Sequence, residues 1–362
     1  MDNYVHQPMI TYIGNKRKII PHICNIIKNI SKDLQKDKLN IVDGFCGSTV
    51  VARSFVTYAD NLYVNDLELY SYLMAQCFLI EPSCDDKRRI EEHITRMNNL
   101  TTLTPGIISE NYAPNDDKNI QMNERCFYTT ENAMRFDTMR KYIDDHVEEY
   151  LRQYCMVPLL IKASIHTNTS GVFKGFYKDK EGKGCFGGAG KNALERILKK
   201  IKIDVPVWHG LPDVESHCSN LEIIDFAEGL PDVDVVYLDP PYNQHPYGSN
   251  YFMLNVIVNN KIDTEISRVS GIPVNWNKSN YNYKQKAKNS MKKLLDILSK
   301  KTRYIILSYN NEGIITDEDW VELFEPFIYE KKEINYNAFK GSRNLKDRSK
   351  DVMEILYVLC PK

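Results

Sequence analysis

The sequence predicts an α/β protein with a doubly wound, mainly parallel sheet and a second unit inserted into it. Two apolar segments, residues 39–43 and 233–238, have the composition of buried parallel strands, and each runs into a loop with glycine or proline. Helical stretches alternate with further strand candidates on both sides of a polar region. We therefore expect a sheet domain formed by residues 1–80 and 204–362, and an inserted domain formed by residues 81–203.

The remaining expected elements follow from periodicity and from turn residues. The additional strand candidates are residues 62–64, 304–308 and 354–358. The expected helices of the sheet domain are residues 18–30, 50–57, 70–79 and 284–300. The insertion is expected to hold helices at 85–97 and 131–151, followed by a glycine-rich, basic hairpin and loop over residues 168–188.

Composition restricts the class of protein and its compartment. The 362 residues are 43% hydrophobic and 26% charged, which is typical of a globular domain. The nine cysteines are odd in number and include no Cys-x-x-Cys pair, so we expect neither a disulfide framework nor a structural zinc site. No apolar run approaches the length of a membrane span or resembles a signal peptide. We expect a cytoplasmic protein without membrane contact.

The formal net charge of −1 hides opposed blocks of charge. Residues 151–203 carry 11 Lys and Arg against 3 Asp and Glu, and residues 261–303 again carry 11 against 3. Residues 204–241 carry no Lys or Arg against 9 Asp and Glu. The first basic block mixes lysine with glycine, aromatic and amide residues, a mixture suited to a loop that contacts phosphates and base edges. We expect DNA contacts from Lys174, Lys178 and Lys183.

The strongest motif is Asp239-Pro240-Pro241-Tyr242, which directly follows the apolar strand 233–238. Two prolines fix the backbone, so a carboxylate, backbone carbonyls and an aromatic ring are held in one arrangement. Such an arrangement can accept both hydrogens of an amino group on a planar base while the ring stacks on that base.

A second motif, Asp43-Gly44-Phe45-Cys46-Gly47-Ser48, follows the strand 39–43 and precedes a helix. Strand–glycine–helix turns bind many nucleotide-type ligands, so this motif alone identifies none of them. Asp66 lies 19 residues after Gly47, where an acidic side chain can accept both hydroxyls of a ribose. A third segment, residues 12–16 (Tyr-Ile-Gly-Asn-Lys), precedes the first helix.

In this order, the three motifs, Asn65-Asp66 and the long insertion resemble the Dam-like, alpha-group DNA adenine methyltransferases. The continuation of residues 243–251 is similar to the modification methylases of type II restriction-modification systems. The resemblance covers residues 8–75 and 204–362. It implies a Rossmann-like, class I S-adenosyl-L-methionine-dependent methyltransferase fold whose insertion is a target-recognition domain. It also implies methyl transfer from S-adenosyl-L-methionine to the N6 amino group of adenine in duplex DNA.

The resemblance also implies roles for individual residues. Tyr12 and Lys16 would contact the methyl donor, together with Asp239. The loop residues Asp43, Phe45 and Gly47 would line its methionine end, and Asp66 would hold its ribose. Tyr247 and Asn250 would contact DNA. The catalytic residues would be Asp239, Pro240, Pro241 and Tyr242.

The sequence departs from the family pattern at a few positions. Thr49 replaces the last glycine of the first loop. The residue beside the adenine ring of the methyl donor has two candidate locations, Ser219-Asn220 and Asp225-Phe226. Residues 308–310 and Tyr336 fall where the family completes its base pocket.

We expect direct in-line methyl transfer to a flipped adenine, without a covalent intermediate or a metal. The alternatives are a cytosine-N4 methyltransferase, which usually has serine in place of Asp239, an RNA or protein-amide methyltransferase, and a catalytically silent DNA-binding protein with the same fold. The expected partners are double-stranded DNA and a restriction endonuclease that acts on the same site without a stable complex. We expect the protein to be a monomer.

Overall fold

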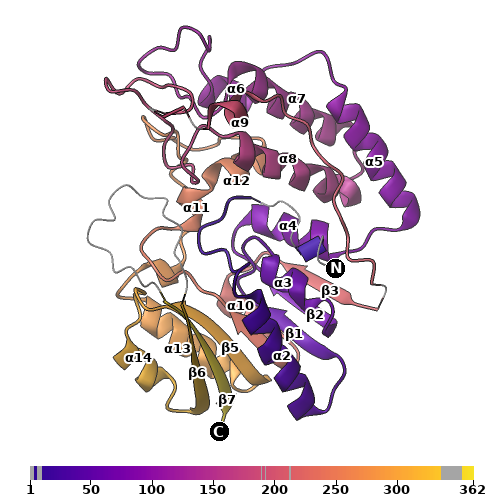
Figure 1. Ribbon diagram of the computed structural model, residues 1–362, viewed down its shortest axis with the longest axis vertical. Coiled ribbons are helices and arrows are strands. Elements are labelled where there is room, and N and C mark those ends of the chain that lie inside the picture. The colour runs from indigo at the N-terminus through magenta and orange to yellow at the C-terminus, as the bar shows by residue number, and fades with distance from the viewer. Residues whose placement is uncertain (1–3, 6–9, 189, 192, 212, 336–352) are drawn as a thin grey trace.

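A seven-stranded sheet forms the centre of the protein (Figure 1). The computed structural model describes residues 4–5, 10–188, 190–191, 193–211, 213–335 and 353–362. The strand order is β3-β2-β1-β4-β5-β7-β6. The strands are β1 (Leu39–Asp43), β2 (Ala59–Asn65), β3 (Glu215–Ser219), β4 (Val233–Leu238), β5 (Thr302–Asn310), β6 (Phe327–Asn335) and β7 (Met353–Pro361).

The sheet is mainly parallel, as the sequence predicted. The pairs β3–β2, β2–β1, β1–β4 and β4–β5 are parallel, whereas β7 is antiparallel to both β5 and β6. Two edge strands were not predicted. β3 contains mostly polar residues, and β6 has charged residues in the middle of its sequence, so neither has the apolar run of a central strand.

Helices cover both faces of this sheet, which confirms the doubly wound arrangement. Consecutive strand residues point to opposite faces. Ile41 packs in a core with α2 (Ile20–Leu34), α3 (Val50–Phe55) and α4 (Leu69–Leu79). Its neighbour Val42 packs in a second core with α10 (Ile223–Gly229), α13 (Ala287–Leu298) and α14 (Asp317–Leu323).

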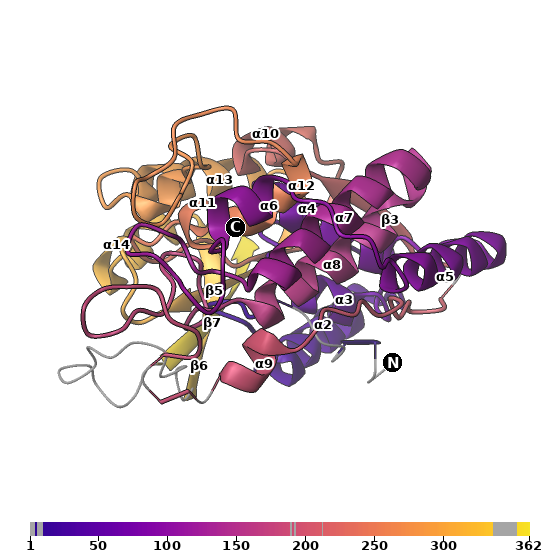
Figure 2. The ribbon, with the colours of Figure 1, turned by 90° about the horizontal axis from the view of Figure 1, so that it is seen from above.

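Residues 81–203 form a mainly helical unit on one side of the sheet (Figures 1 and 2). Its elements are α5 (Cys84–Asn98), α6 (Ile107–Tyr112), α7 (Thr130–His146), the 3-10 turn η1 (Glu149–Leu151), α8 (Arg152–His166) and α9 (Leu194–Leu198). α8 packs against α7 and, on its other side, against α4 and α12 (Phe252–Asn259) of the sheet unit. Buried residues of this helical unit and of the sheet face that carries Ile41 belong to one continuous core. The division of the chain into two domains therefore remains a prediction.

The glycine-rich segment does not form the expected regular hairpin. Between residues 168 and 188, the described residues pair at one isolated bridge, Lys178 with Gly184. The segment is organised by Asn168, whose buried side-chain amide donates to the carbonyls of Cys126 and Cys185 and whose oxygen accepts from the amide of Gly187. A side chain therefore satisfies backbone groups that a strand ladder would otherwise pair.

Several helix ends also differ from prediction. The helix expected at 18–30 spans Ile20–Leu34, because Pro21 occupies its first turn, and the helix expected at 131–151 ends at His146. The helix α8 was missed because it is apolar on nearly all sides and contains Pro158. All nine cysteines are free thiols. Among the described residues, no helix is long and apolar enough to cross a membrane.

Candidate active site at the ends of the parallel strands

The loops that follow β1 and β4 leave the sheet side by side. The two strands pair in parallel with Asp43 opposite Tyr237, and the amide of Gly44 donates to the carbonyl of Tyr237. From β1 the strand order runs outward in opposite directions, so this is the topological switch point of the sheet, where α/β proteins bind ligands. A pocket of about 880 Å³, part of it open to solvent, lies here.

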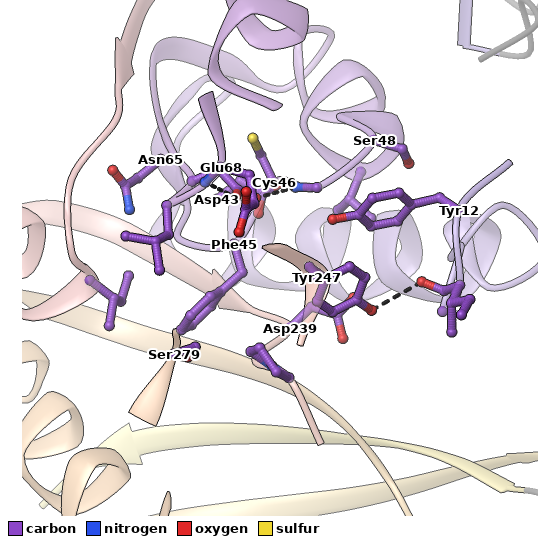
Figure 3. Close-up of a pocket in the computed structure, with 18 of the residues that line it drawn as sticks. Tyr12, Asp43, Phe45, Cys46, Ser48, Asn65, Glu68, Asp239, Tyr247 and Ser279 are labelled. Carbon is purple, nitrogen blue, oxygen red and sulfur yellow. Dashed lines mark hydrogen bonds between the residues drawn. The ribbon is translucent and has the colours of Figure 1, made fainter. Parts of the chain in front are cut away.

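Nine of the residues expected at the site line this pocket (Figure 3). They are Tyr12, Lys16, Asp43, Phe45, Gly47, Asp66, Asp239, Pro241 and Tyr247. Figure 3 shows the rings of Tyr12 and Tyr247 at one end of the pocket, and the ring of Phe45 and the side-chain amide of Asn65 at the other. Residues that are far apart in sequence therefore form one concave surface.

Asp66 closes the loop that follows β1. Its two carboxylate oxygens accept hydrogen bonds from the amides of Gly47, at 2.7 Å, and Glu68, at 2.8 Å. Burial raises the pKa of Asp66 to about 6, although these backbone hydrogen bonds act to lower it. Burial, followed by the charge of Asp66, raises the pKa of Glu68 to about 7. The floor of the pocket therefore carries two acidic groups on one short segment.

Asp43 is the most deeply buried acid of the pocket, with 1% of its surface exposed. Within the described part of the chain, neither of its carboxylate oxygens makes a hydrogen bond of good geometry, although the backbone amides of Phe45 and Ala52 lie close enough to act to lower its pKa. Burial, followed by the charge of Asp239, raises its pKa well above the usual range. A buried acid without a partner is costly in the free protein, and a cationic ligand in the pocket would compensate it.

The loop geometry explains the positions of its small residues. Gly47 has φ +49°, and a Cβ there would lie 2.8 Å from a ring carbon of Tyr12, so glycine is required both by conformation and by space. Thr49, where the family has glycine, also adopts a left-handed conformation, with φ 65°. It is fully buried, and its hydroxyl lacks a hydrogen-bond partner among the described residues. The backbone therefore keeps the glycine-like conformation despite a β-branched side chain.

The segment around Tyr12 is held by residues that follow the catalytic motif. The ring of Tyr12 stacks on Tyr247 and Tyr251, with centroid distances of 4.9 and 4.8 Å. The amide of Ile13 donates to the hydroxyl of Tyr251, and the hydroxyl of Tyr247 donates to the carbonyl of Ile13. These contacts attach the N-terminal loop to the wall of the pocket.

Lys16 lies between two carboxylates. Its Nζ is 2.9 Å from Oδ1 of Asp239 and 3.1 Å from Oε1 of Glu354, and it donates to the carbonyl of Gly14 at 3.1 Å. Burial disfavours its charge, but Asp239 and Glu354 outweigh this effect and hold the pKa of Lys16 well above its usual range. Burial raises the pKa of Asp239 to about 6, and the adjacent Lys16 opposes this rise.

Of the other residues of the Asp-Pro-Pro-Tyr motif, Pro241 lines the pocket, whereas Pro240 and Tyr242 lie beside it and are not among its lining residues. Pro240 is buried, and the carbonyl of Tyr242 accepts a hydrogen bond from the amide of Ile314. The partly exposed ring of Tyr242 meets the ring of Tyr309 edge to face at 6.3 Å. Tyr309 in turn uses its hydroxyl to accept from the amide of Ile315. Of the residues expected to complete the base pocket, Tyr336 lies outside the described residues.

Neither of the two candidate locations for the contact to the adenine ring of the donor, Ser219-Asn220 and Asp225-Phe226, lines the pocket itself. Leu221, Glu222 and Ile223, directly after Ser219-Asn220, line the pocket. Asn220 itself donates to the carbonyls of Asp66 and Leu67, which fixes the loop. Asp225 is exposed on α10 and Phe226 packs in the core, so neither lines the pocket.

Sequence reasoning missed several residues of this site. Glu68, Asn277, Ser279 and Asn282 line the pocket, and Glu354 contacts Lys16. Three of them come from the irregular segment between α12 and α13, which offers no motif in the sequence. Among the residues that the structure describes, no group of His, Cys, Asp and Glu is arranged to hold a metal ion.

The residues expected to contact DNA occupy two kinds of environment. Lys174 and Lys178 are exposed, and Lys183 is half-buried, on the segment organised by Asn168. Tyr247 is half-buried against Tyr12. Asn250 is 3% exposed, its amide faces the carbonyl of His245, and its own carbonyl accepts from the amide of Phe173. The described position of Asn250 thus links the catalytic loop to the basic segment and presents no free side chain.

The fold and the pocket define a class I α/β methyltransferase. A family model of the D12 class N6 adenine-specific DNA methyltransferases matches residues 12–322. The chain belongs to this family, and it is an enzyme that methylates the N6 amino group of adenine in DNA. Its methyl donor is the one implied by the family, S-adenosyl-L-methionine.

Curated relatives extend this comparison over nearly the whole chain. The chain is 28% identical to the type II methyltransferase M.CviAII of Paramecium bursaria Chlorella virus 1, over 96% of this chain and 97% of that protein. It is 26% identical to the type II methyltransferase M.NlaIII of Neisseria lactamica, over 97% of this chain and 99% of that protein. It is also 27% identical to the modification methylase StsI of Streptococcus sanguinis, over 96% of this chain and 51% of that protein.

The conformation of Thr49 predicts the relative stability of two variants. In the left-handed region a side chain costs about 1 kcal/mol or more, whereas glycine adopts it freely. Thr49→Gly should therefore have a free energy of unfolding about 1 kcal/mol or more higher than Thr49→Ala, and the position of Thr49 as the N-cap of α3 favours glycine in the same direction. Urea denaturation of both variants measures the difference, and an alanine variant at least as stable as the glycine variant contradicts the proposed strain.

Proposed function

We propose that Asp239 and the carbonyl of Pro240 hold the amino group of an adenine that has rotated out of duplex DNA, beside a methyl donor bound in the pocket. The observation that carries this assignment is the placement of Asp239 at the pocket, paired with the buried Lys16, near Asp43 and followed in the chain by the ring of Tyr242. A target base and a donor can meet at this carboxylate.

The residues of the pocket fit S-adenosyl-L-methionine. The carboxylate of Asp43 has no partner among the described residues and suits the ammonium group of the methionine part. Asp66 lies at the end of β2, where an acidic side chain accepts ribose hydroxyls. Leu221 and Ile223 offer apolar surface for the adenine ring. When bound, S-adenosyl-L-methionine supplies an electrophilic methyl group on a sulfonium.

The chain itself positions the nucleophile. Oδ1 of Asp239 pairs with Lys16, and we assign Oδ2 and the carbonyl of Pro240 to the two amino hydrogens of the adenine. With both hydrogens held, the nitrogen lone pair points toward the methyl group. Stacking on Tyr242 compensates part of the few kcal/mol that unstacking the base costs. Positioning and the preorganised carboxylate and carbonyl dipoles then lower the barrier.

Double-stranded DNA is proposed to lie along the basic segment that carries Lys174, Lys178 and Lys183. The amide of Phe173 donates to the carbonyl of Asn250, so this segment is tied to the loop that follows the catalytic motif. Phosphate contacts made there would place the DNA over the opening of the pocket. The recognised base sequence depends on side chains of residues 81–203.

We also propose a biological setting. M.CviAII and M.NlaIII are named type II methyltransferases and match this chain along nearly their whole length. By that similarity the chain would be the modification methylase of a type II restriction-modification system. A restriction endonuclease would act on the same site without a stable complex. The enzyme would act as a monomer in the cytoplasm, where nine free thiols are compatible with a reducing environment.

Asp43→Asn tests the binding of the methyl donor. The variant keeps the shape of the side chain but removes the charge that we assign to the ammonium group. We expect the Kd for S-adenosyl-L-methionine to rise by about tenfold or more, which corresponds to about 1.4 kcal/mol. The free energy of unfolding should stay the same or rise, because a buried carboxylate without a partner is removed. Calorimetric titration and urea denaturation measure the two quantities.

The matched control for this experiment is Asp37→Asn, which removes an exposed charge before β1 and should leave donor binding unchanged. An unchanged Kd in Asp43→Asn would show that the buried carboxylate does not contact the donor.

Asp239→Ala tests the assignment of the catalytic residue. The variant loses an acceptor for the amino group, and we expect methyl transfer to fall by about a thousandfold or more. The measurement is transfer of a radiolabelled methyl group to duplex DNA, followed by digestion to nucleosides. Wild-type protein should label N6-methyl-2′-deoxyadenosine only, and DNA from cells that express it should resist cleavage at one sequence.

Two substitutions of Tyr242 accompany this test. Tyr242→Trp keeps a stacking surface and should retain more activity than Tyr242→Ala, whose loss should appear mainly as weaker DNA binding. Full activity in a folded Asp239→Ala protein would refute the assignment, and label in cytosine or in RNA would refute the substrate.

Replacing Lys174, Lys178 and Lys183 together by alanine tests the DNA-binding segment. Each phosphate contact contributes about 0.9 to the slope of log K against log salt, so the slope should fall by roughly 2–3. A matched triple variant replaces Lys28, Lys32 and Lys300, which are exposed near the amino ends of the strands and away from the pocket. Fluorescence anisotropy over a salt series measures both slopes, and equal slopes would contradict the proposed DNA path.

A further inference from the structure

The buried cation beside the catalytic carboxylate has a second acidic neighbour on a different strand. Glu354 lies on β7, which is separated from β4 by β5 in the sheet. Its side chain is 8% exposed and reaches Lys16 at 3.1 Å. The hydroxyl of Ser308 donates to the same carboxylate at 2.6 Å. Both contacts fall on Oε1 of Glu354, so this oxygen is held between Ser308 and Lys16.

The three hydrogens of the Lys16 ammonium group have three acceptors. These are Oδ1 of Asp239 at 2.9 Å, Oε1 of Glu354 at 3.1 Å and the carbonyl of Gly14 at 3.1 Å. An ammonium group donates three hydrogen bonds, so this set satisfies it completely. Without Glu354, Lys16 would have one unused buried hydrogen and one carboxylate partner, and it would draw closer to Asp239.

We propose that Glu354 is a positioning residue for methyl transfer: by sharing Lys16 with Asp239, it holds that lysine in place and leaves the catalytic carboxylate a strong acceptor. The proposal rests on the assignment of Asp239 as the residue that holds the target amino group. With Glu354 ionised, two carboxylates and one ammonium carry a net charge of −1, which faces the cationic methyl donor and the positive charge that develops on the attacking nitrogen.

The charge of Glu354 also affects the protonation of Asp239. Besides burial, the groups that influence the pKa of Asp239 are Lys16, which lowers it, and Glu354, which raises it. Asp43 on β1, Tyr237 on β4 and Tyr247 after the catalytic motif also face this carboxylate. Asp239 is a stronger acceptor for an amino hydrogen as a carboxylate than as a protonated acid, so transfer should fall as the pH falls through about 6, the pKa of Asp239.

Glu354→Gln keeps the shape and the hydrogen-bonding capacity of the side chain and removes its charge. We expect the single-turnover rate of methyl transfer at pH 7.5, with saturating donor and DNA, to fall by about tenfold. We expect the acid limb of the rate profile to move to lower pH, because removing Glu354 lowers the pKa of Asp239. The KM values for donor and DNA should change by less than about threefold, since the residue contacts neither.

Measuring the rate at saturating donor separates the effect of Asp239 protonation from the effect of protonating the other acids of the pocket. Asp66 and Glu68 have pKa values of about 6 and 7, and their protonation would affect donor binding and therefore KM. Glu333→Gln serves as the matched control, because it removes an exposed carboxylate that pairs with Lys331 on the neighbouring strand β6. The control should leave both the rate and its pH profile unchanged.

Glu354→Asp keeps the negative charge but places it one methylene further from Lys16. If Glu354→Gln does not fold, this variant tests the positioning role instead. We expect a smaller loss of rate and an acid limb between those of the wild type and of Glu354→Gln. If folded Glu354→Gln has the wild-type rate and the wild-type acid limb, the positioning role is overturned. If only Glu354→Asp folds, the same result in that variant overturns it. If Asp239→Ala is inactive in the same assay, the assignment of Asp239 would still stand.

Discussion

Asp43 and Asp239 can act on one pair of substrates because β1 and β4 are hydrogen-bonded neighbours. Parallel pairing places Asp43 opposite Tyr237, and so the loops after both strands start at the same edge of the sheet. The loop after β1 and the motif after β4 are separated by almost 200 residues of chain, including all of the helical unit. A change in this pairing would separate the two loops even if each kept its local structure.

The second constraint is electrostatic. Asp43, Asp66, Glu68 and Asp239 converge on one pocket, and burial raises the pKa of each. Lys16 is buried beside them and satisfies only part of this negative charge. Such a site is expensive in the free protein, and it suits a cationic donor. The same imbalance that weakens the free structure therefore favours binding of the substrate.

Much of this site was predictable from the sequence. The apolar strands before Asp43 and Asp239, and the glycines and prolines after them, indicate a backbone that is largely determined locally. The strand β3 was not predictable because it lies at the edge of the sheet and lacks the apolar run of a central strand. The helix α8 was not predictable because it is buried on nearly all sides and so lacks the alternation of apolar and polar residues that marks a surface helix. Asn250 looked like a DNA contact in sequence, yet its described side chain is buried in a loop.

By itself, the sequence determined the class of fold, the motif Asp239-Pro240-Pro241-Tyr242 and three of the four acids that converge on the pocket, Asp43, Asp66 and Asp239. These features depend on local residue types and spacing. Only the tertiary structure decided that Glu68 joins these acids, that Glu354 shares Lys16 with Asp239 and that Tyr12 stacks on Tyr247 and Tyr251, which lie more than 230 residues later in the chain. Such contacts depend on the order of strands in the sheet and on which side chains are buried together. Neither of these can be read from a local pattern in a single sequence.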